Sequence, residues 1–327
     1  GFPDLLFLGS RQTINNGTFK ILGEGGATDT TPMNVGFYAV TTFNNADLLI
    51  GANATTIFGV ANAFGTTSGS LPGVTVEANG ALNLSATAGA SATSQDLTIA
   101  SLAGAGNVVN SAGVAGTATL TINGSATTTF SGTIKDGGYN GRTAGLVALT
   151  KEGSGTQTLS GTNTYTGATT VSAGTLLLSS TGSIAAGSAV TVQTGAAIGG
   201  DGTISGNLTL ASGAKFVFDL NDNPLTVGGT FALDSTFGVD DLVTSSLGVI
   251  DWSTVTVGTY TLIGTSFVFN SGNIENFGLV NAYSSGGKQM YFANGSLDLV
   301  VVPEPATWLL LAGSLTVLMA SRRRRRS

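Results

Sequence analysis

Side chains that could carry out catalysis are sparse in this sequence. The chain has no His and no Cys, which excludes Ser-His-Asp triads, Cys nucleophiles and the usual zinc sites. The one acidic cluster is Asp240-Asp241 with Asp251. A β-helix enzyme that cuts acidic polysaccharides needs clustered carboxylates for acid–base work or calcium, and commonly a basic side chain. A solvated turn explains this cluster at least as well.

Basic partners for such an acid are also scarce. Before residue 303 the only arginines are Arg11 and Arg142, and five lysines are scattered along the chain. Residues 219–223 imitate the start of a calcium loop, but Pro224 stands where that loop needs Gly and Thr230 where it needs Glu. No dinucleotide-binding or phosphate-binding glycine motif occurs. We therefore expect no catalytic residue, no cofactor and no metal, and keep a carbohydrate-active β-helix enzyme (a lyase or hydrolase) as the alternative.

The C-terminal segment carries the sharpest pattern. It begins with a proline motif, continues as an uncharged run (306–321), and ends in five arginines; its residues are Val302, Pro303, Glu304 and Pro305, the membrane-segment ends Ala306 and Ala320, and Arg322, Arg323, Arg324, Arg325 and Arg326. As a helix the sixteen-residue run spans about 24 Å, less than the roughly 30 Å hydrocarbon core. The arginines can extend to the lipid surface and stay in the cytoplasm.

This order of motif, apolar helix and basic end resembles the PEP-CTERM sorting signal. The resemblance implies export, an inner-membrane intermediate, and processing by the membrane protease-transpeptidase exosortase. It also implies a bacterium of Gram-negative type. The two prolines are expected to keep residues 303–305 out of both the preceding strand and the following helix, so that a protease can bind them extended. An ordinary tail anchor is the simpler alternative.

Residues 149–178 form the stretch around which the rest of the chain is organised. Their Thr, Ser and Gly residues alternate with single apolar residues, as in short strands with one buried face. Part of the stretch recurs upstream, because residues 127–133 match residues 156–162. A second cassette, apolar-x-x-Gly-small, recurs at Gly174, Gly195 and Gly213. A repeat of roughly 20 residues made of strands and turns is typical of a β-solenoid coil.

The same stretch resembles the autotransporter-associated β-strand repeat. Weaker similarity extends over about residues 74–218. The resemblance implies an exported bacterial surface protein and a right-handed parallel β-helix, and it implies nothing about a binding partner. A β-sandwich is the structural rival, but the near absence of aromatic residues between 71 and 215 favours a narrow solenoid over two packed sheets.

Composition divides the chain into four parts. Residues 1–70 are comparatively rich in Phe and are expected to form an irregular start or β cap, with a tight turn at Asn15-Asn16-Gly17. Residues 71–215 are the expected solenoid. Residues 216–302 are rich in aromatics and are expected to form an antiparallel β cap, with a hairpin at Asn294-Gly295. Residues 303–327 are the sorting signal, with the one helix of the chain.

Charge and hydropathy limit the possible partners. Only 9% of the 327 residues are charged, and the net charge is −6 although five arginines lie at the end. An acidic body disfavours nucleic acid as a partner, because phosphate binding needs basic patches. Since no secretory signal is visible at the start, Gly1 is expected to be a processed or truncated end. We expect an exported structural or adhesin-like protein of the cell surface, matrix or biofilm, with exosortase, the membrane and surface exopolysaccharide as partners.

Overall fold

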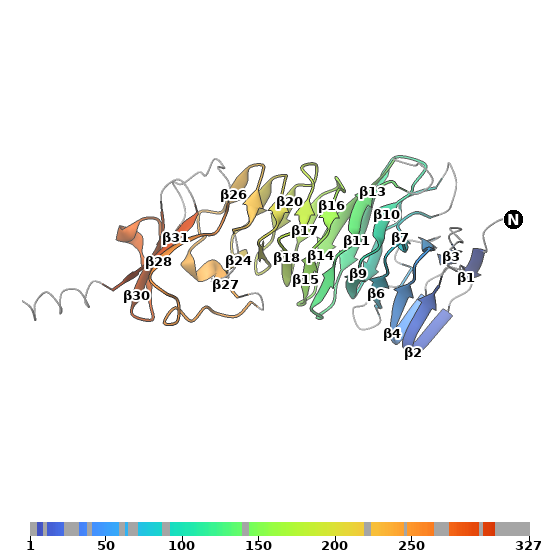
Figure 1. Cartoon of the computed structure of the whole chain (residues 1–327), viewed down its shortest axis with the longest axis horizontal. Helices are drawn as coiled ribbons and strands as arrows, with labels where there is room; N and C mark the ends of the chain where they lie inside the picture. The colour runs from blue at the N-terminus through green and yellow to red at the C-terminus, as the bar shows by residue number, and fades with distance from the viewer. Residues whose placement is uncertain are drawn as a thin grey trace, which may run out of the picture.

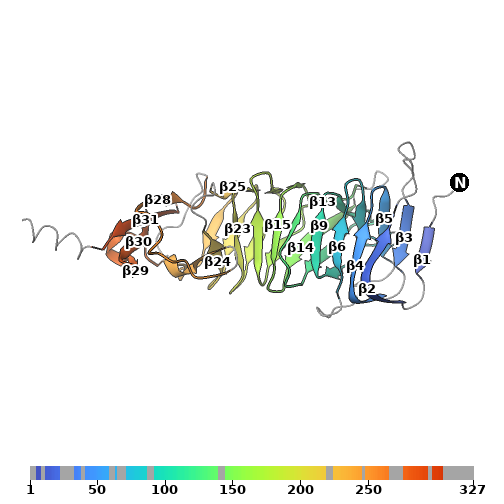
Figure 2. The ribbon, with the colours of Figure 1, turned by 60° about the horizontal axis from the view of Figure 1, so that its bottom comes forward.

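The structure is a computed structural model of the chain. It describes residues 5–8, 12–22, 33–37, 41–58, 63–64, 71–86, 92–138, 144–218, 224–244, 247–264, 275–293 and 297–304. Strands dominate these residues, and they stack one behind another into an elongated body (Figures 1 and 2). Within these ranges, helical structure is limited to two short 3-10 turns, η2 (Val239–Asp241) and η3 (Leu279–Asn281).

Two long parallel sheets run along the body. The ten-stranded sheet contains, in spatial order, β2 (Gln12–Ile21), β4 (Thr41–Ile50), β6 (Gly73–Val76), β9 (Ser101–Gly104), β12 (Thr128–Phe130), β15 (Thr156–Leu159), β18 (Thr175–Leu178), β21 (Ala197–Gly200), β24 (Lys215–Val217) and β27 (Leu242–Val243). The seven-stranded sheet contains β8 (Leu97–Ile99), β11 (Gly116–Ile122), β14 (Gly145–Lys151), β17 (Thr169–Val171), β20 (Val190–Val192), β23 (Leu208–Leu210) and β26 (Phe231–Leu233).

A third side of the body is shared by two parallel sheets. The six-stranded sheet contains β1 (Leu5–Leu8), β3 (Met33–Phe37), β5 (Ala54–Phe58), β7 (Ala81–Asn83), β10 (Asn107–Asn110) and β13 (Thr133–Asp136). The four-stranded parallel sheet contains β16 (Thr162–Asn163), β19 (Ser183–Ile184), β22 (Thr203–Ile204) and β25 (Thr226–Val227). From β14 onward each coil gives one strand to three sheets in turn, which confirms the solenoid and excludes the sandwich. The right hand of the coil stays a prediction.

The internal repeats of the sequence are neighbours in register. Thr129 pairs with Thr158, so the two recurrences of the first motif stack directly. Val171 pairs with Val192, which is the recurrence of the second cassette. The cassette glycines Gly174, Gly195 and Gly213 have φ of 64°, 77° and 70°, the left-handed region that favours glycine. The repeat therefore encodes both a strand and the corner that follows it.

The core lies inside the coil and is filled by single apolar side chains. In β14, Val147 and Leu149 point inward and are fully buried, whereas the alternate residues Leu146, Ala148 and Thr150 are partly or well exposed. Burying one such side chain stabilises the fold by about 1.5–3 kcal/mol. Stacked coils make these residues into one continuous core along the body. The period-two pattern of the sequence is thus explained by one buried and one solvated face per strand.

The predicted start of the solenoid at residue 71 is wrong. β2 and β4 already pair in parallel over most of their length, and so do β1, β3 and β5. The aromatic side chains Phe37, Phe43 and Phe64 pack edge to face inside these first coils, with ring centroids 5.3 and 5.1 Å apart. Phe-rich composition therefore marks a coil filled by larger side chains. Asn16 and Gly17 do take positive φ, but they lie within β2 and do not join two strands.

The predicted end of the solenoid at residue 215 is also early. β25, β26 and β27 continue the parallel stacking as far as Val243, because Phe216 and Phe231 occupy inward positions that Val and Leu fill in earlier coils. An antiparallel sheet then follows, in the order β28 (Gly258–Thr261), β31 (Asp298–Pro303), β30 (Lys288–Phe292) and β29 (Tyr283–Ser285). The β30–β31 pairing confirms the hairpin partners, while its turn lies outside the described residues.

Aromatic side chains join the last coil to this antiparallel sheet. The Phe218 ring stacks on Trp252 at 6.2 Å and meets Tyr260 of β28 edge to face at 5.5 Å. Phe237 packs near Phe292 of β30, with ring centroids 5.9 Å apart. The antiparallel sheet therefore covers the end of the core, where an open strand edge would otherwise be free to recruit other chains.

Candidate functional site

The first residues of the predicted processing motif are held in the antiparallel sheet. Val302 pairs with Gln289, Pro303 ends β31 opposite Lys288, and the Glu304 N–H donates to the carbonyl of Gly287 at 3.3 Å. The expectation that Pro303 releases the chain from the sheet is wrong. The pairing with β28 already stops at Val301, so Pro303 has a strand neighbour on one side only, a strand-end position that tolerates the missing N–H.

The rest of the sorting signal lies outside the described residues. This holds for Pro305, for the expected membrane segment from Ala306 to Ala320, and for Arg322–Arg326. Among the residues that the structure describes, no helix is long and apolar enough to span a bilayer. The C-terminal transmembrane helix therefore stays a prediction.

Lys288, which lies opposite Pro303 in the sheet, holds β30 against a neighbouring turn. The Lys288 ammonium donates to the carbonyl oxygens of Trp252 at 2.8 Å and Ser253 at 2.7 Å. It thereby ties the turn at residues 252–253 to the first residue of β30, directly opposite Pro303. A Cβ at Gly286 would lie 2.6 Å from the Ser253 nitrogen, so glycine is needed for this close approach. The sheet that ends next to Glu304 is therefore held in place by the bonds of Lys288 to this turn.

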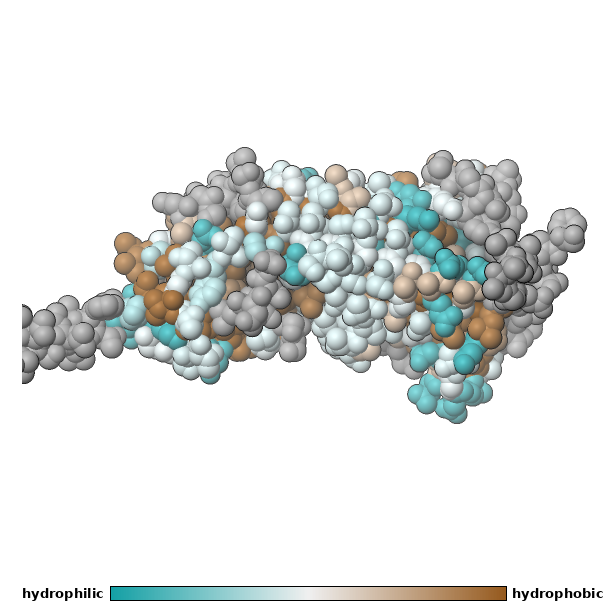
Figure 3. All heavy atoms as spheres, viewed as in Figure 1, coloured by the Kyte–Doolittle hydropathy of each residue, from teal (hydrophilic) through white to brown (hydrophobic). Residues whose placement is uncertain are grey.

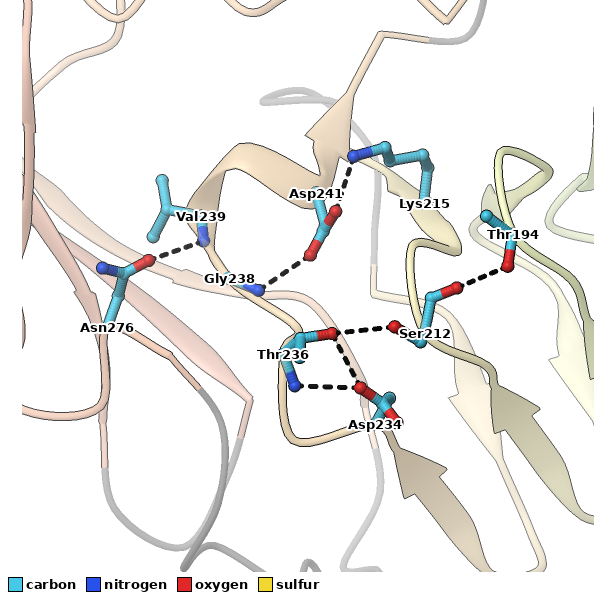
Figure 4. Close-up of polar contacts among 9 residues, drawn as sticks. All are labelled: Thr194, Ser212, Lys215, Asp234, Thr236, Gly238, Val239, Asp241 and Asn276. Carbon is cyan, nitrogen blue, oxygen red and sulfur yellow. Dashed lines mark hydrogen bonds and ion pairs between the residues drawn. The ribbon is translucent and has the colours of Figure 1, made fainter.

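The acidic cluster of the sequence is not one site. Asp241 accepts a 2.5 Å ion-pair hydrogen bond from Lys215 and a 2.9 Å bond from the Gly238 N–H, which closes the η2 turn (Figure 4). Asp251 accepts bonds from the Ser253 N–H and hydroxyl at 3.0 and 2.6 Å, and these lower the pKa of its carboxyl. Asp240 is exposed. Each described carboxylate of the trio has a local turn-forming role or faces solvent.

A chain of polar contacts along one edge of the last coils was not predicted from the sequence. The Thr194 hydroxyl donates to the Ser212 carbonyl at 2.7 Å, and the Ser212 hydroxyl meets that of Thr236 at 3.2 Å. Thr236 in turn bonds Asp234 through its hydroxyl and N–H, at 2.7 and 3.0 Å (Figure 4). These bonds lower the pKa of the Asp234 carboxyl. No group of three or more metal-ligating side chains occurs in the described ranges.

Lys151 is buried at the end of β14, where apolar alternation would place a hydrophobic residue. Its ammonium donates to the carbonyl of Glu152, to that of Gly153 at 2.9 Å and to that of Ala173 at 3.3 Å. Burial lowers the pKa of Lys151 to about 8. The side chain stabilises the corner between two coils by satisfying carbonyls that turn inward. Its inward position, two residues after Leu149, was the signal in the sequence.

Gln157 has a similar bridging role in β15, with a side chain only 1% exposed. Its Oε1 accepts from the Leu102 N–H at 3.3 Å and from the Thr128 hydroxyl at 3.0 Å, and its Nε2 donates to the Leu102 carbonyl at 3.1 Å. β9 and β12 pair only at Gly104 and Phe130. The side-chain amide of Gln157 therefore replaces the strand neighbour that Leu102 lacks.

Two further buried polar side chains connect coils of the matched repeat. Asn163 accepts from the Ile134 N–H at 2.9 Å and donates to the Ser183 carbonyl at 3.0 Å, which bridges β13 and β19 across β16. The Tyr165 hydroxyl bonds that of Thr169 at 2.6 Å, and the Thr169 hydroxyl bonds that of Ser188 in the next coil at 2.9 Å. Burial raises the pKa of Tyr165 to about 12. These groups are bonded within the fold and have a structural role.

Comparison with known protein families agrees with the geometry of this stretch. Residues 149–178 match the passenger-associated transport repeat, and they contain Lys151, Gln157, Asn163 and Tyr165. The comparison with curated proteins gave no match. The matched repeat and the stacked parallel sheets fit an exported cell-surface protein of the autotransporter-passenger or adhesin type.

Proposed function

We propose that this chain is a structural or adhesin-like protein of the bacterial surface or extracellular matrix, sorted through its C-terminal segment by exosortase. The observation that carries the proposal is the parallel stacking of the solenoid, whose strands run from Gln12 to Val243 in one sheet. Such a body is a rigid spacer with extended faces, as repeat solenoids commonly are. Matrix exopolysaccharide and other surface components are the partners we propose for it.

The proposed sorting route begins with export and an inner-membrane intermediate in a Gram-negative-type bacterium. Residues 306–320 hold the chain in the membrane, Arg322–Arg326 stay in the cytoplasm, and exosortase cuts beside Pro303-Glu304-Pro305. The sequence pattern supports this route, and the position of Glu304 at the end of the braced sheet is compatible with it. Since residues 302–304 are held in the sheet, we place the proposed cut after Glu304.

Substitution of the motif prolines separates sorting from simple anchoring. Pro305→Ala, alone or with Pro303→Ala, should leave membrane retention unchanged and prevent processing. Pro303→Ala alone also tests folding, because alanine restores a backbone N–H at the end of β31 without disturbing its pairing with Lys288. The readout is the membrane-bound and released fractions in a host that carries exosortase. Equal processing of the wild-type and doubly substituted chains would contradict the proposal.

A non-catalytic role is part of the proposal. Asp241 forms an ion pair with the ammonium of Lys215, whereas Asp251 is bonded by Ser253 in a separate turn. These carboxylates therefore do not form an acid–base pair with each other or with Asp240. We expect the full chain to release no reducing sugar and no unsaturated uronide from acidic polysaccharides, with or without calcium. Activity that is lost in Asp241→Ala, while Asp251→Ala retains it, would instead support the carbohydrate-active enzyme.

A further inference from the structure

The 3-10 turn η3 presents the apolar side chains of two neighbouring residues to solvent. Val280 is 97% exposed and Leu279 is 54% exposed. Elsewhere in the described ranges the exposed large hydrophobic residues are separated from one another along the chain: Leu22, Val114, Leu146, Val249 and Val257. Single exposed apolar residues are normal, whereas apolar side chains that gather into a patch mark an interaction site. The pair in η3 is therefore a candidate contact surface.

Side-chain hydrogen bonds hold the backbone of this turn in place. The Asn276 amide donates to the Asn281 carbonyl at 3.0 Å, and the Asn281 amide donates to the Phe277 carbonyl at 3.2 Å. The Asn276 side-chain oxygen also accepts from the Val239 N–H at 3.0 Å, which ties the turn to η2 (Figure 4). The two apolar side chains are thus presented at a fixed place, so little conformational entropy is lost on contact.

The outer face of the antiparallel sheet adds further apolar side chains. Burial alternates along β31, so Val300 and Val302 project from this face, and Tyr291 of β30 lies opposite Val300. Val257 is 55% exposed and directly precedes β28, at the end of the sheet where Val302 lies. Figure 3 shows hydrophobic residues at the end of the body that the antiparallel sheet occupies. The apolar pair in η3 is therefore part of an apolar end of the molecule.

The same end of the body leads into the proposed membrane segment, and the inference rests on that segment. Only Pro305 separates Glu304 from the uncharged run that begins at Ala306. Two residues span at most about 7 Å, and the headgroup layer on one side of a bilayer is about 5–8 Å thick. If residues 306–320 cross the bilayer, the end of β31 must therefore lie at the lipid surface.

The turn η3 and Glu304 lie at opposite ends of β30. The Gly278 N–H donates to the Phe292 carbonyl at 3.0 Å, and the Glu304 N–H donates to the Gly287 carbonyl at 3.3 Å. The five residues of β30 span about 14–17 Å. Figures 1 and 2 place the whole antiparallel sheet at one end of the long axis. A membrane segment alone would let the body pivot, whereas a second contact at η3 fixes its orientation.

We propose that Leu279 and Val280 insert among the headgroups of zwitterionic lipids, so that this end of the body rests on the membrane. Burial of apolar side chains drives interfacial contacts of this kind. Two side chains bind lipid weakly, but the membrane segment keeps them at a high local concentration. The described charged residues from 251 onward are four acids and one lysine: Asp251, Glu275, Asp298, Glu304 and Lys288. This acidic balance disfavours anionic lipids.

The test uses the full chain in vesicles of phosphatidylcholine and phosphatidylethanolamine. The sequence contains no cysteine, so Val280→Cys carries a single environment-sensitive nitrobenzoxadiazole label. Its emission should shift to shorter wavelength and be quenched by lipids that bear a nitroxide at the headgroup. Val249→Cys is the matched control, because Val249 is 92% exposed but lies in the turn after β27, and its label should stay in water. Adding Leu279→Asp to the Val280→Cys chain should reduce the quenching.

Flotation of the chains with the vesicles separates this inference from the proposed function. If the chains do not float, the membrane segment fails and the contact fails with it. If they float but the label at Val280 is quenched no more than the label at Val249, the contact alone is overturned. An emission shift without quenching by lipid would assign the apolar end to a second copy of the chain, which also overturns the inference. Circular dichroism checks that all the labelled chains fold alike.

Discussion

Replacement of Gln157 by Leu tests how the solenoid compensates for missing strand pairing. Leu has a similar volume and places an apolar side chain at this inward position of β15, but it removes both bonds to Leu102. Leaving a buried N–H or C=O without a partner costs about 1–3 kcal/mol each. Since the new side chain recovers part of this through apolar burial, we expect a loss of about 2–4 kcal/mol.

Urea unfolding alone would average this effect over the whole solenoid, because coils of a repeat protein can open separately. Amide hydrogen exchange resolves it. Peptides that contain Leu102 should lose protection in Gln157→Leu, whereas peptides from β20 to β23 should keep it. Thr158→Val, at the neighbouring outward position, is the matched control and should change stability by less than about 0.5 kcal/mol. Unchanged protection at Leu102 would refute the proposed role of the Gln157 amide.

Three further substitutions test corners, buried groups and the end of the solenoid. Gly174→Ala should cost more than Gly195→Ala, because both have positive φ but only a Cβ at Gly174 would meet backbone, at 2.4 Å; thermal unfolding of the pair measures the difference. Since the pKa of Tyr165 is raised above its unfolded value of about 10, the free energy of unfolding should fall between about pH 10 and 12. Tyr165→Phe should remove this pH dependence, as measured by urea unfolding at several pH values in that range. Lys215→Met should leave Asp241 without its partner and cost about 1–2 kcal/mol by urea unfolding, and an equal cost for Lys135→Met would argue against a specific contribution.

The repeat stretch shows what the sequence could predict. Val171-x-x-Gly174 and its recurrences specify an inward apolar residue followed by a left-handed corner, and this local rule is enough to predict parallel stacked coils. The register of the first motif followed in the same way, because Thr129 and Thr158 occupy equal places in successive coils.

The boundaries could not be predicted by the same rule. Aromatic content distinguished the ends from the middle, but Phe43 and Phe216 fill the same inward positions that Val and Leu fill elsewhere. Amino-acid composition indicates how large the side chains inside a coil are, but it does not indicate whether the strands pair in parallel. The inward position of Lys151 could be read from the alternation of β14, but the backbone carbonyls that it bonds could not. The role of Gln157 was missed because its partner Leu102 is a backbone group of another coil, which leaves no sequence signature.

The placement of Pro303 shows the limit of residue-level rules. Proline was expected to end the strand before itself, yet it pairs opposite Lys288 because β28 no longer flanks β31 there. Whether a proline is tolerated depends on which side of the strand has a neighbour. That information is tertiary, so the sequence around Pro303 could not predict it.

The most direct test of the proposed function is the intact mass of surface-associated protein from a host that carries exosortase. We expect a chain that ends between Glu304 and Ala306, with the apolar segment and all five arginines removed. The sheet around Val302 and Pro303 should remain complete in this product. Recovery of the full-length chain, with Arg322–Arg326 still attached, would contradict exosortase sorting and leave an ordinary tail anchor.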